Sequence, residues 1–172
     1  MKILEKVQKI KEACMSTKDL QRNINVSEAY HLWSHLVQRY SVLHITETFE
    51  PFIRDGDLKI ILATGKNTLS KNIGILEKEA VLYGLPLPLR PPKQTKVSGT
   101  SDPFSDRHIY RRVLRGIQSF LPTHMAAFMH STTPKIRELF FNFMIEELKL
   151  YDKYLEYGKL KGYTIMPPAY SQ

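Results

Sequence analysis

The spacing of apolar residues is the feature that most constrains the fold of this chain. Apolar side chains recur every three to four positions through four long stretches, which begin near residues 27, 57, 105 and 134. That period places apolar side chains along one face of an α-helix. Four helices of roughly 27 residues would each be about 40 Å long, matched in length as a helical bundle requires. The sequence therefore predicts an all-α protein built as an antiparallel four-helix bundle.

Each predicted helix has an inner face of apolar and aromatic residues, which we expect to form the core. On the first helix these are Ala29, Leu32, Trp33, Leu36, Val37, Tyr40 and Leu43, and on the second Ile61, Leu62, Leu69, Ile73, Leu76, Ala80 and Val81. On the third they are Ile109, Val113, Leu114, Ile117, Phe120, Leu121, Met125 and Phe128, and on the fourth Ile136, Leu139, Phe140, Phe143, Leu150, Tyr151, Tyr154 and Leu155.

Residues that favour helix ends bound the four stretches. The expected N-caps are Ser27, Asp57, Ser105 or Asp102, and Thr133 followed by Pro134. Gly84 and Gly162 are expected to end the second and fourth helices. The first helix should reach about residue 53 with a bend at Pro51, and Pro122 should kink the third.

The connections predict how the helices pack. Asp55-Gly56-Asp57 is a strong turn signal after the first helix, and a short connection also separates the third helix from the fourth. Residues 85–104, between the second and third helices, contain five prolines and a Ser-Gly-Thr-Ser run. Two helical hairpins joined by a single long crossover form the ferritin-like arrangement.

An additional short helix is expected before the bundle. Apolar residues repeat at helical spacing through residues 2–15, and a polar connector over residues 16–26 follows. We therefore divide the chain into residues 1–26 and a bundle over residues 27–172. No apolar stretch of signal-peptide length opens the chain, and the longest uncharged stretch, residues 116–134, holds Gln and His side chains that a membrane span tolerates poorly.

Charge and cysteine content narrow the classes of function. The 172 residues include 25 Lys and Arg against 17 Asp and Glu, a formal net charge of +8. This surplus favours contact with acidic surfaces, whether nucleic acid, anionic lipid or acidic protein. The single cysteine, Cys14, cannot form an intramolecular disulfide, which favours a reducing compartment.

A ferritin-like dinuclear metal centre needs a Glu from each of two helices and a Glu-x-x-His pair from each of the other two. Only Glu28 and His31 have that spacing here. The remaining carboxylates of the second and fourth helices, which have no such histidine, are Glu77, Glu79, Glu146, Glu147, Asp152 and Glu156. The sequence therefore predicts no metal centre, no cofactor and no ferritin-like oxidase activity. If a metal binds, the candidate is one ion held by some of Glu28, His31 and His35, although both histidines flank the apolar stripe and are interpreted as boundary or surface residues.

The other chemistry-bearing residues favour structural roles. Four other histidines lie at different positions along the first and third predicted helices, and we expect them to form hydrogen bonds in the core, cap helices or contact solvent. These histidines are His44, His108, His124 and His130. The sequence gives no basis for a Ser-His-Asp catalytic triad or for a Cys-His nucleophile and base, and Cys14 is expected in the core. We therefore predict that this protein is not an enzyme.

A basic stripe runs along the third helix. Its residues are Arg107, Arg111, Arg112 and Arg115, and the preceding connection adds Arg90, Lys93 and Lys96. The stripe could grip phosphate or an acidic partner. The alternative is a solvated helix face paired with acids of a neighbouring helix.

Short motifs carry a resemblance to a known family. They are the stretch from Glu28 to Leu32-Trp33, Gly84-Leu85-Pro86-Leu87-Pro88, Asp102-Pro103-Phe104-Ser105-Asp106, Tyr151-Asp152-Lys153, Lys161-Gly162-Tyr163 and Met166-Pro167-Pro168. Through them the chain from Ser27 onward resembles the spore-coat-protein-F-like proteins of spore-forming bacteria, a group in the ferritin-like superfamily. The resemblance implies a four-helix ferritin-like fold and a link to the spore coat, with no established reaction. Members can show a Glu-Lys-His cluster in the second helix, where this chain reads Ser70-Lys71-Asn72, which puts a metal role in doubt.

The leading hypothesis is a non-enzymatic structural or interaction protein, a component of the spore coat or of the sporulating cell. The alternative is a degenerate ferritin-like protein that binds a metal or a small ligand, and a third hypothesis is a basic module on an anionic polymer. The expected partners are a second copy in a dimer, other coat proteins, or an anionic surface met by the basic face, with no membrane span and no specific nucleic acid. The expected location is the cytoplasm or the spore coat within the sporulating cell.

Overall fold

The structure, a computed structural model, describes residues 15–92 and 104–170. All regular structure in these two ranges is helical, and they contain no strand. The predicted helix at residues 2–15, apart from Met15, and the core position of Cys14 lie outside the described residues. Within the same two ranges, no helix combines the length and the apolar character that crossing a membrane requires.

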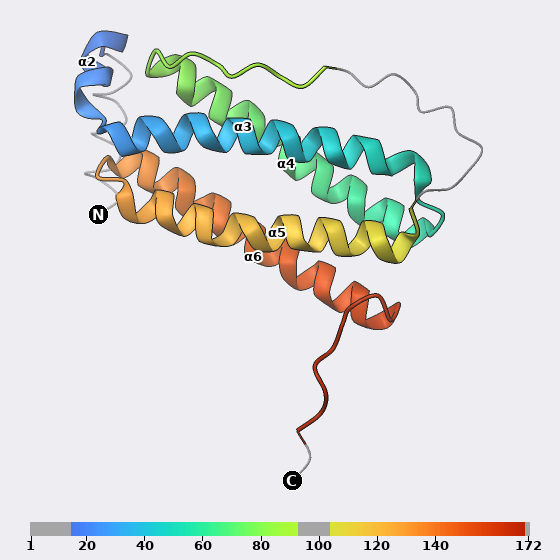
Figure 1. Cartoon of the computed structure of the whole chain (residues 1–172). Coiled ribbons are helices and arrows are strands. Elements are labelled where there is room, and N and C mark those ends of the chain that lie inside the picture. The colour runs from blue at the N-terminus through green and yellow to red at the C-terminus, as the bar shows by residue number, and fades with distance from the viewer. Residues whose placement is uncertain (1–14, 93–103, 171–172) are drawn as a thin grey trace.

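Four long helices lie alongside one another (Figure 1). They are α3 (Val26–Phe49), α4 (Gly56–Leu82), α5 (Asp106–His130) and α6 (Pro134–Leu160), and two short elements, α2 (Thr17–Asn23) and the 3-10 turn η1 (Glu50–Phe52), complete the described part. Short connections join α3 to α4 and α5 to α6, so that each pair is an antiparallel hairpin.

The start of α5 lies at the same end of the molecule as the start of α4. The Asp106 carboxylate accepts hydrogen bonds from the backbone N–H groups of Arg54 and Asp55, at 2.9 and 3.0 Å. The two helices therefore run in the same direction. The described part of the connection between them, residues 85–92, has no regular structure.

Several predicted helix ends are confirmed. Ser105 caps α5 by accepting from the N–H of His108, and Thr133 precedes Pro134 at the start of α6. Gly84 and Gly162 follow α4 and α6, each with a φ of 65°, the left-handed conformation that glycine adopts without strain. Pro122 lies inside α5, which continues to its end at residue 130.

Two predicted N-caps are wrong. Asn25, not Ser27, caps α3, because its side chain accepts from the N–H of Glu28 while Glu28 bonds back to the N–H of Asn25, a capping box. Asp55, not Asp57, caps α4 by accepting from the N–H groups of residues 57 and 58. The α-helical part of α3 ends at Phe49 and the chain continues as the 3-10 turn η1, which contains Pro51 and has Ile53 as its C-cap, close to the predicted end near residue 53.

Residues 16–26 are not simply a polar connector, because they include helix α2. Leu20 on this helix is buried and packs into the core. The helix lies so close to the end of α4 that a Cβ added at Gly84 would be 2.3 Å from Nε2 of Gln21. Glycine is favoured at residue 84 by its backbone φ of 65°, since the exposed end of the Gln21 side chain could move aside.

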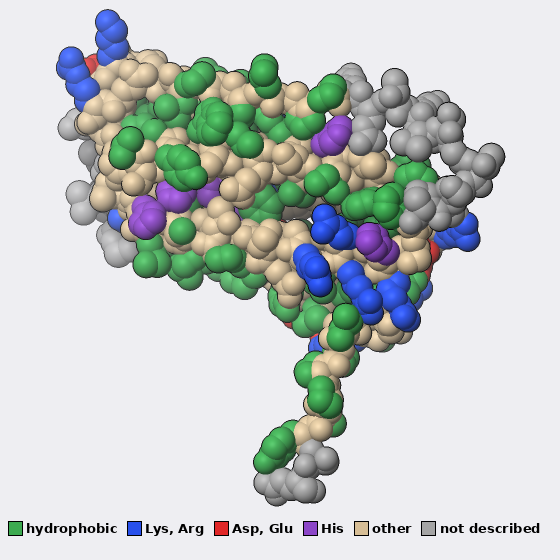
Figure 2. Space-filling view, in the orientation of Figure 1, with side chains coloured by type: hydrophobic (Ala, Val, Ile, Leu, Met, Phe, Trp, Pro, Cys, Tyr) green, Lys and Arg blue, Asp and Glu red, His purple; other side chains and the backbone are tan. Residues whose placement is uncertain are grey.

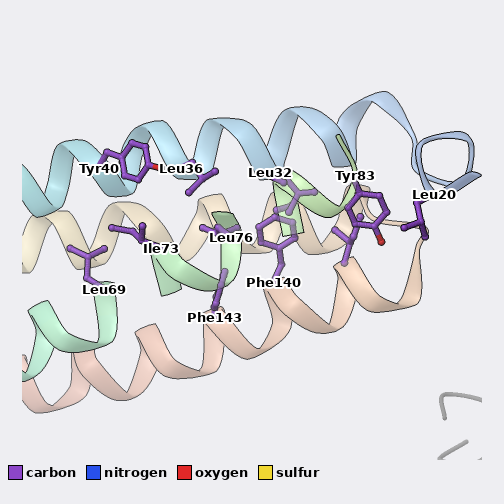
Figure 3. Close-up of a cluster of buried hydrophobic side chains, with 13 residues drawn as sticks. Leu20, Leu32, Leu36, Tyr40, Leu69, Ile73, Leu76, Tyr83, Phe140 and Phe143 are labelled. Atoms are coloured by element: carbon purple, nitrogen blue, oxygen red, sulfur yellow. The ribbon is translucent and has the colours of Figure 1, made fainter. Parts of the chain in front are cut away.

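Two separate hydrophobic clusters form the core. The first lies where α3 begins and includes Leu32, Leu36, Leu76 and Phe140 (Figure 3). The second lies at the opposite end and consists of Phe49, Ile53, Leu58, Leu62, Ile109, Tyr110, Leu114, Ile117, Tyr154 and Tyr157. Some residues of the predicted inner faces are instead exposed, namely Trp33, Val81 and Met125.

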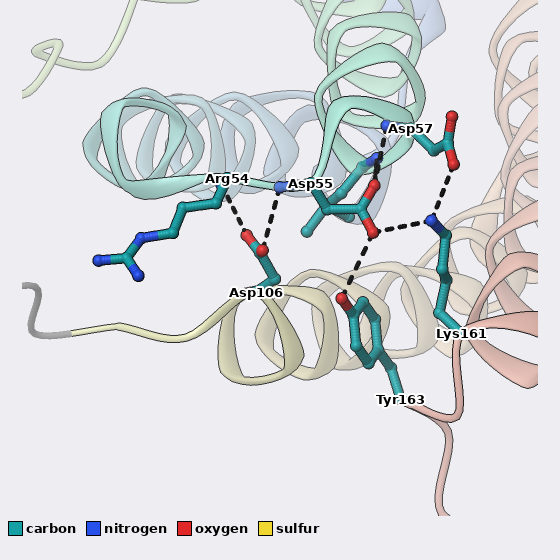
Figure 4. Close-up of polar contacts among 7 residues, drawn as sticks. Arg54, Asp55, Asp57, Asp106, Lys161 and Tyr163 are labelled. Atoms are coloured by element: carbon teal, nitrogen blue, oxygen red, sulfur yellow. Dashed lines mark hydrogen bonds and ion pairs between the residues drawn. The ribbon is translucent and has the colours of Figure 1, made fainter.

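A polar network closes the end of the second cluster (Figure 4). Lys161 pairs with the carboxylates of Asp55 at 3.0 Å and Asp57 at 2.8 Å, and the Tyr163 hydroxyl donates to Asp55. The hydrogen bond from Lys161 lowers the pKa of Asp55 to about 2. With Asp106, this network joins the starts of α4 and α5 to the end of α6.

Candidate functional site

A row of polar side chains on α3 is buried in the interior. Glu28, His31, His35 and Arg39 follow one another every three or four residues, and their exposed fractions are 0, 8, 0 and 2%. The interpretation of His31 and His35 as boundary or surface residues is therefore wrong. The helix buries two adjacent faces, since its apolar stripe packs in the first cluster while this polar row contacts α5 and α6.

Glu28 connects two helix starts. One of its carboxylate oxygens accepts from the N–H of Asn25 at 2.8 Å, and the other accepts from the N–H of Thr133 at 2.6 Å. The Thr133 hydroxyl, 3.1 Å away, donates a third hydrogen bond. The carboxylate thus caps α3 and holds the residue at which α6 begins.

The histidines form a ladder between α3 and α5, and Figure 2 shows histidine side chains grouped between these helices. His31 Nε2 lies 3.0 Å from His130 Nδ1, and His35 Nδ1 donates to the carbonyl of His31 at 2.8 Å. The rings of His35 and His124 stack with their centroids 5.2 Å apart. Burial, reinforced by the nearby charge of His130, lowers the pKa of His31; burial and His124 together lower the pKa of His35 to about 3.

A buried ion pair lies at the inner end of this ladder. Arg39 Nη2 donates to Glu147 Oε2 at 3.3 Å and to His124 Nε2 at 3.0 Å. Because arginine has no lone pair to offer, Nε2 of His124 must be the unprotonated nitrogen. Burial also lowers the pKa of His124. The Arg39 guanidinium lies 4.6 Å above the Phe120 ring, a cation–π contact.

The candidate ligands Glu28, His31 and His35 do not converge on one point. Glu28 is occupied by helix starts, and the histidines contact His130 and a backbone carbonyl. No group of three or more His, Cys, Asp or Glu side chains that could hold a metal ion occurs in residues 15–92 and 104–170.

The carboxylates of α4 and α6 have other contacts. Glu77 accepts from Tyr40 and Arg90, and Glu79 pairs with Lys135. The remaining pairs are Glu146 with Lys71 and Glu156 with Lys159. The one buried polar residue that α4 contributes among the described residues is Asn72.

A cavity of about 330 Å³ lies beside the ion pair, between the two hairpins. All four long helices line it, and Arg39 and Glu147 form part of its wall. The rest of the wall is mostly apolar and includes Val42, Phe49, Leu62, Leu69, Ile117, Phe120 and Leu150. The cavity therefore separates the two hydrophobic clusters and resembles in composition the sites that hold small ligands.

Two cavity-lining side chains have buried polar atoms without a hydrogen-bond partner. They are the Nε of Arg39 and the hydroxyl of Tyr154. Buried polar groups are hydrogen-bonded in the great majority of cases, and an orphaned one costs roughly 1–3 kcal/mol.

The basic stripe on α5 reaches the mouth of this cavity. Arg112 and Arg115 line the opening and are exposed, whereas Arg111 donates to the carbonyl of Tyr163 at 2.9 Å. Within the part of the chain that the structure describes, Arg107, Arg112 and Arg115 form no ion pair. Lys and Arg side chains gather over the first part of α5 in Figure 2.

Sequence reasoning missed both the cavity and the buried ion pair. A search for regularly spaced apolar residues does not detect Arg39, because arginine is polar. Arg39 nevertheless follows His31 and His35 at four-residue spacing. Gly65 and Gly116, which lie inside long helices and line the cavity, are the available signal, because glycine inside a helix leaves space beside the backbone.

Comparison with known proteins gives a family and two related folds. The sequence profile of the family described as "Protein of unknown function (DUF3231)" matches residues 14–172. A "putative spore coat protein" from Bacillus halodurans C-125 has a similar structure, with a TM-score of 0.81, 21% sequence identity, and coverage of 87% of this chain and 96% of that one. A conserved hypothetical protein from Mycobacterium tuberculosis aligns with a TM-score of 0.65 at 11% identity, over 84% of this chain and 97% of that one. No curated protein matches the chain.

Proposed function

The chain belongs to the DUF3231 family of proteins of unknown function, and we propose that it is a non-enzymatic structural or interaction protein of the spore coat or the sporulating cell. The proposed fold is a ferritin-like four-helix bundle with the connection from α4 to α5 as its long crossover. The likeness to the Bacillus halodurans structure supports this fold, and that protein's description as a "putative spore coat protein" supports the location. The resemblance of short motifs to spore-coat-protein-F-like proteins also supports this fold and this location.

The position of Arg39 carries the non-enzymatic part of this proposal. A dinuclear centre of the ferritin kind needs inward carboxylates from four helices. Here a permanently charged guanidinium lies in the core, 3.3 Å from the carboxylate of Glu147 and 3.0 Å from His124. A fixed positive charge at this distance repels a metal cation and occupies the side chains of Glu147 and His124. The residues present therefore do not fit a metal pair of the ferritin kind.

Localisation tests the proposed location. A fluorescent fusion expressed from its own promoter in a spore-forming bacterium should be low in growing cells and should concentrate at the forespore or the spore surface. Uniform fluorescence in growing cells that is unchanged through sporulation would contradict the proposal. A fluorescent protein alone, under the same promoter, is the control.

Metal analysis tests the non-enzymatic part independently. Protein prepared without a histidine tag should contain less than one iron or manganese per chain and should not oxidise ferrous iron faster than buffer. Two tightly held metal ions per chain would overturn the assignment. One zinc that is lost in the His31→Ala/His35→Ala variant would instead favour a single-ion site.

Small-ligand binding is a second candidate function, and the cavity between the hairpins favours it. Its volume of about 330 Å³ is in the lower part of the range of ligand pockets, and most of its wall is apolar. Binding in the interior is compatible with a place in the spore coat. The first candidate is tested by location and the second by binding.

A further inference from the structure

The cavity has an apolar interior and a basic mouth. Its inner wall carries aliphatic and aromatic side chains from all four long helices, among them Val42, Leu62, Ile117 and Leu150. Such a wall binds hydrocarbon by removing it from water. The interior therefore selects a ligand with an apolar body.

The charged side chains that line the cavity differ in whether they already have an ion-pair partner. Arg39 is neutralised by Glu147 at 3.3 Å, and Lys66 is paired with Glu50. Arg112 and Arg115, in contrast, are exposed at the opening and have no acidic partner within residues 15–92 and 104–170. The free positive charge lies at the mouth, and arginine suits bidentate contact with a carboxylate.

The length and volume of the cavity limit the ligand. Arg112 at the mouth and Phe120 beside Arg39 are eight residues apart on α5, about 12 Å at a rise of about 1.5 Å per residue. The volume of about 330 Å³ lies in the lower part of the range of ligand pockets, which limits the ligand to a small one. Both limits fit an unbranched chain of about ten carbons.

From the apolar wall, the cavity length and the two unpaired arginines, we propose that this cavity binds a medium-chain anionic amphiphile, with its hydrocarbon between the hairpins and its carboxylate on Arg112 and Arg115. This inference rests on small-ligand binding as the second candidate function and names the class of ligand. The carboxylate lies at the mouth and not beside Arg39, because Glu147 would repel it there.

Calorimetry with three ten-carbon probes tests the class of ligand. Sodium decanoate, below its micelle concentration, should bind the full chain with one site and raise its melting temperature. Decan-1-ol should bind at least tenfold more weakly, and decyltrimethylammonium should not bind measurably. Equal binding of decanoate and decanol would overturn the anionic class but leave small-ligand binding intact. If the unmodified chain binds none of the three probes, both are overturned.

Two glycines provide a matched pair of variants that locate the site. Gly116 lines the cavity and Gly74 does not, and a Cβ at either residue meets no atom within 4 Å. Gly116→Leu should fill the cavity and abolish decanoate binding with an unchanged helical circular dichroism spectrum. Gly74→Leu makes the same change within α4 away from the cavity and should bind decanoate as the unmodified chain does. Unchanged binding by Gly116→Leu would place the ligand elsewhere and overturn the proposal.

A second pair of variants tests the mouth. Arg112→Gln/Arg115→Gln should weaken decanoate binding about tenfold or more and leave decanol binding unchanged. Arg107→Gln/Arg137→Gln removes the same net charge from exposed positions outside the cavity and should change decanoate affinity less than twofold. Equal losses in both pairs would show only a general effect of net charge and would overturn the role of the mouth.

Discussion

Arg39 is the residue on which the polar interior depends. Its guanidinium is 3% exposed and its partner carboxylate on Glu147 is 8% exposed, so neither charge is compensated by water. Replacing Arg39 by Met leaves Glu147 as an unpaired buried charge. Removing one partner of a buried pair costs about 3–5 kcal/mol, whereas replacing both by apolar residues is often neutral.

We therefore predict that Arg39→Met lowers the free energy of unfolding by about 3–5 kcal/mol. The double variant Arg39→Met/Glu147→Leu should recover most of this loss, and urea unfolding followed by circular dichroism measures both. A double variant no more stable than the single one would mean that Arg39 acts through its contact with Phe120 and not through its charge.

His35 makes stability depend on pH near neutrality. Its pKa is about 3 in the folded chain, against an ordinary value of 6.5, because it is buried and faces His31, His124 and Arg39. Below about pH 6.5 the unfolded chain takes up a proton that the folded chain does not. Stability is therefore complete above that pH and decreases as pH falls, by about 2 kcal/mol from this residue at pH 5.

We predict that the melting temperature falls between pH 7 and pH 5 and that His35→Leu flattens this dependence. Calorimetric scans at both pH values, with the exposed His108 replaced by Leu as control, measure the effect. An equal slope in His35→Leu and in the unmodified chain would assign the pH dependence to other groups.

The burial of the histidines shows what the sequence could not reveal at the residue scale. The period of Leu32, Leu36 and Tyr40 identifies one buried face of α3, and it is correct for these three residues. A helix in contact with three others buries more of its surface than one apolar stripe. A search for regularly spaced apolar residues does not detect polar residues on that additional buried surface. Their partners, His124 and Glu147, come from helices 85 to 108 residues later in the chain.

Gly158 sets how closely α5 can approach the end of α6. A Cβ at this position would be 1.9 Å from the hydroxyl of Tyr110, which donates to the carbonyl of Tyr154 and contacts the hydroxyl of Thr164. Only glycine allows this approach. In contrast, a Cβ at Gly74 on α4 has no neighbour within 4 Å.

We predict opposite effects for the same substitution at these two glycines. Gly158→Ala should destabilise the chain by about 1–3 kcal/mol through overpacking, and Gly74→Ala should stabilise it by up to about 1 kcal/mol through helix propensity. Thermal unfolding of both variants measures the effects. Stabilisation by Gly158→Ala would mean that Tyr110 can move aside at no cost.

Helix ends could be predicted wherever one residue provides the signal by itself. Ser105, Pro134, Gly84 and Gly162 act through their own side chain or backbone, and all four predictions are confirmed. The N-cap of α3 was missed because Ser27 and Asn25 are both suitable caps, and the reciprocal bond to Glu28 decides between them. Helix α2 was missed because one buried leucine holds it to the rest of the fold.

At the scale of the whole molecule, self-association stays a prediction. Tyr30, Trp33 and Met129 are 64, 40 and 70% exposed, near the contact between His31 and His130. Closed two-fold dimers are the commonest soluble oligomers. We expect multi-angle light scattering to give twice the chain mass of 20.0 kDa. A monomer at high protein concentration would contradict this expectation.

The cavity and the buried ion pair of Arg39 with Glu147 lie between the two hydrophobic clusters. This separation governs how the molecule unfolds locally. Each cluster can lose its packing while the other stays folded, so the amide hydrogens at the two ends should exchange with solvent as two cooperative units. The unit that contains Tyr110 and Tyr154 is also held by Lys161 on Asp55, a contact that weakens only as that carboxylate approaches its pKa of about 2. The other unit packs against His35, whose burial destabilises the fold from about pH 6.5 downward, so acid should release that unit first. Hydrogen exchange followed by mass spectrometry should therefore show two protection levels along the same helix: amides of α5 near Ala127 lose protection in acid before those near Ile109.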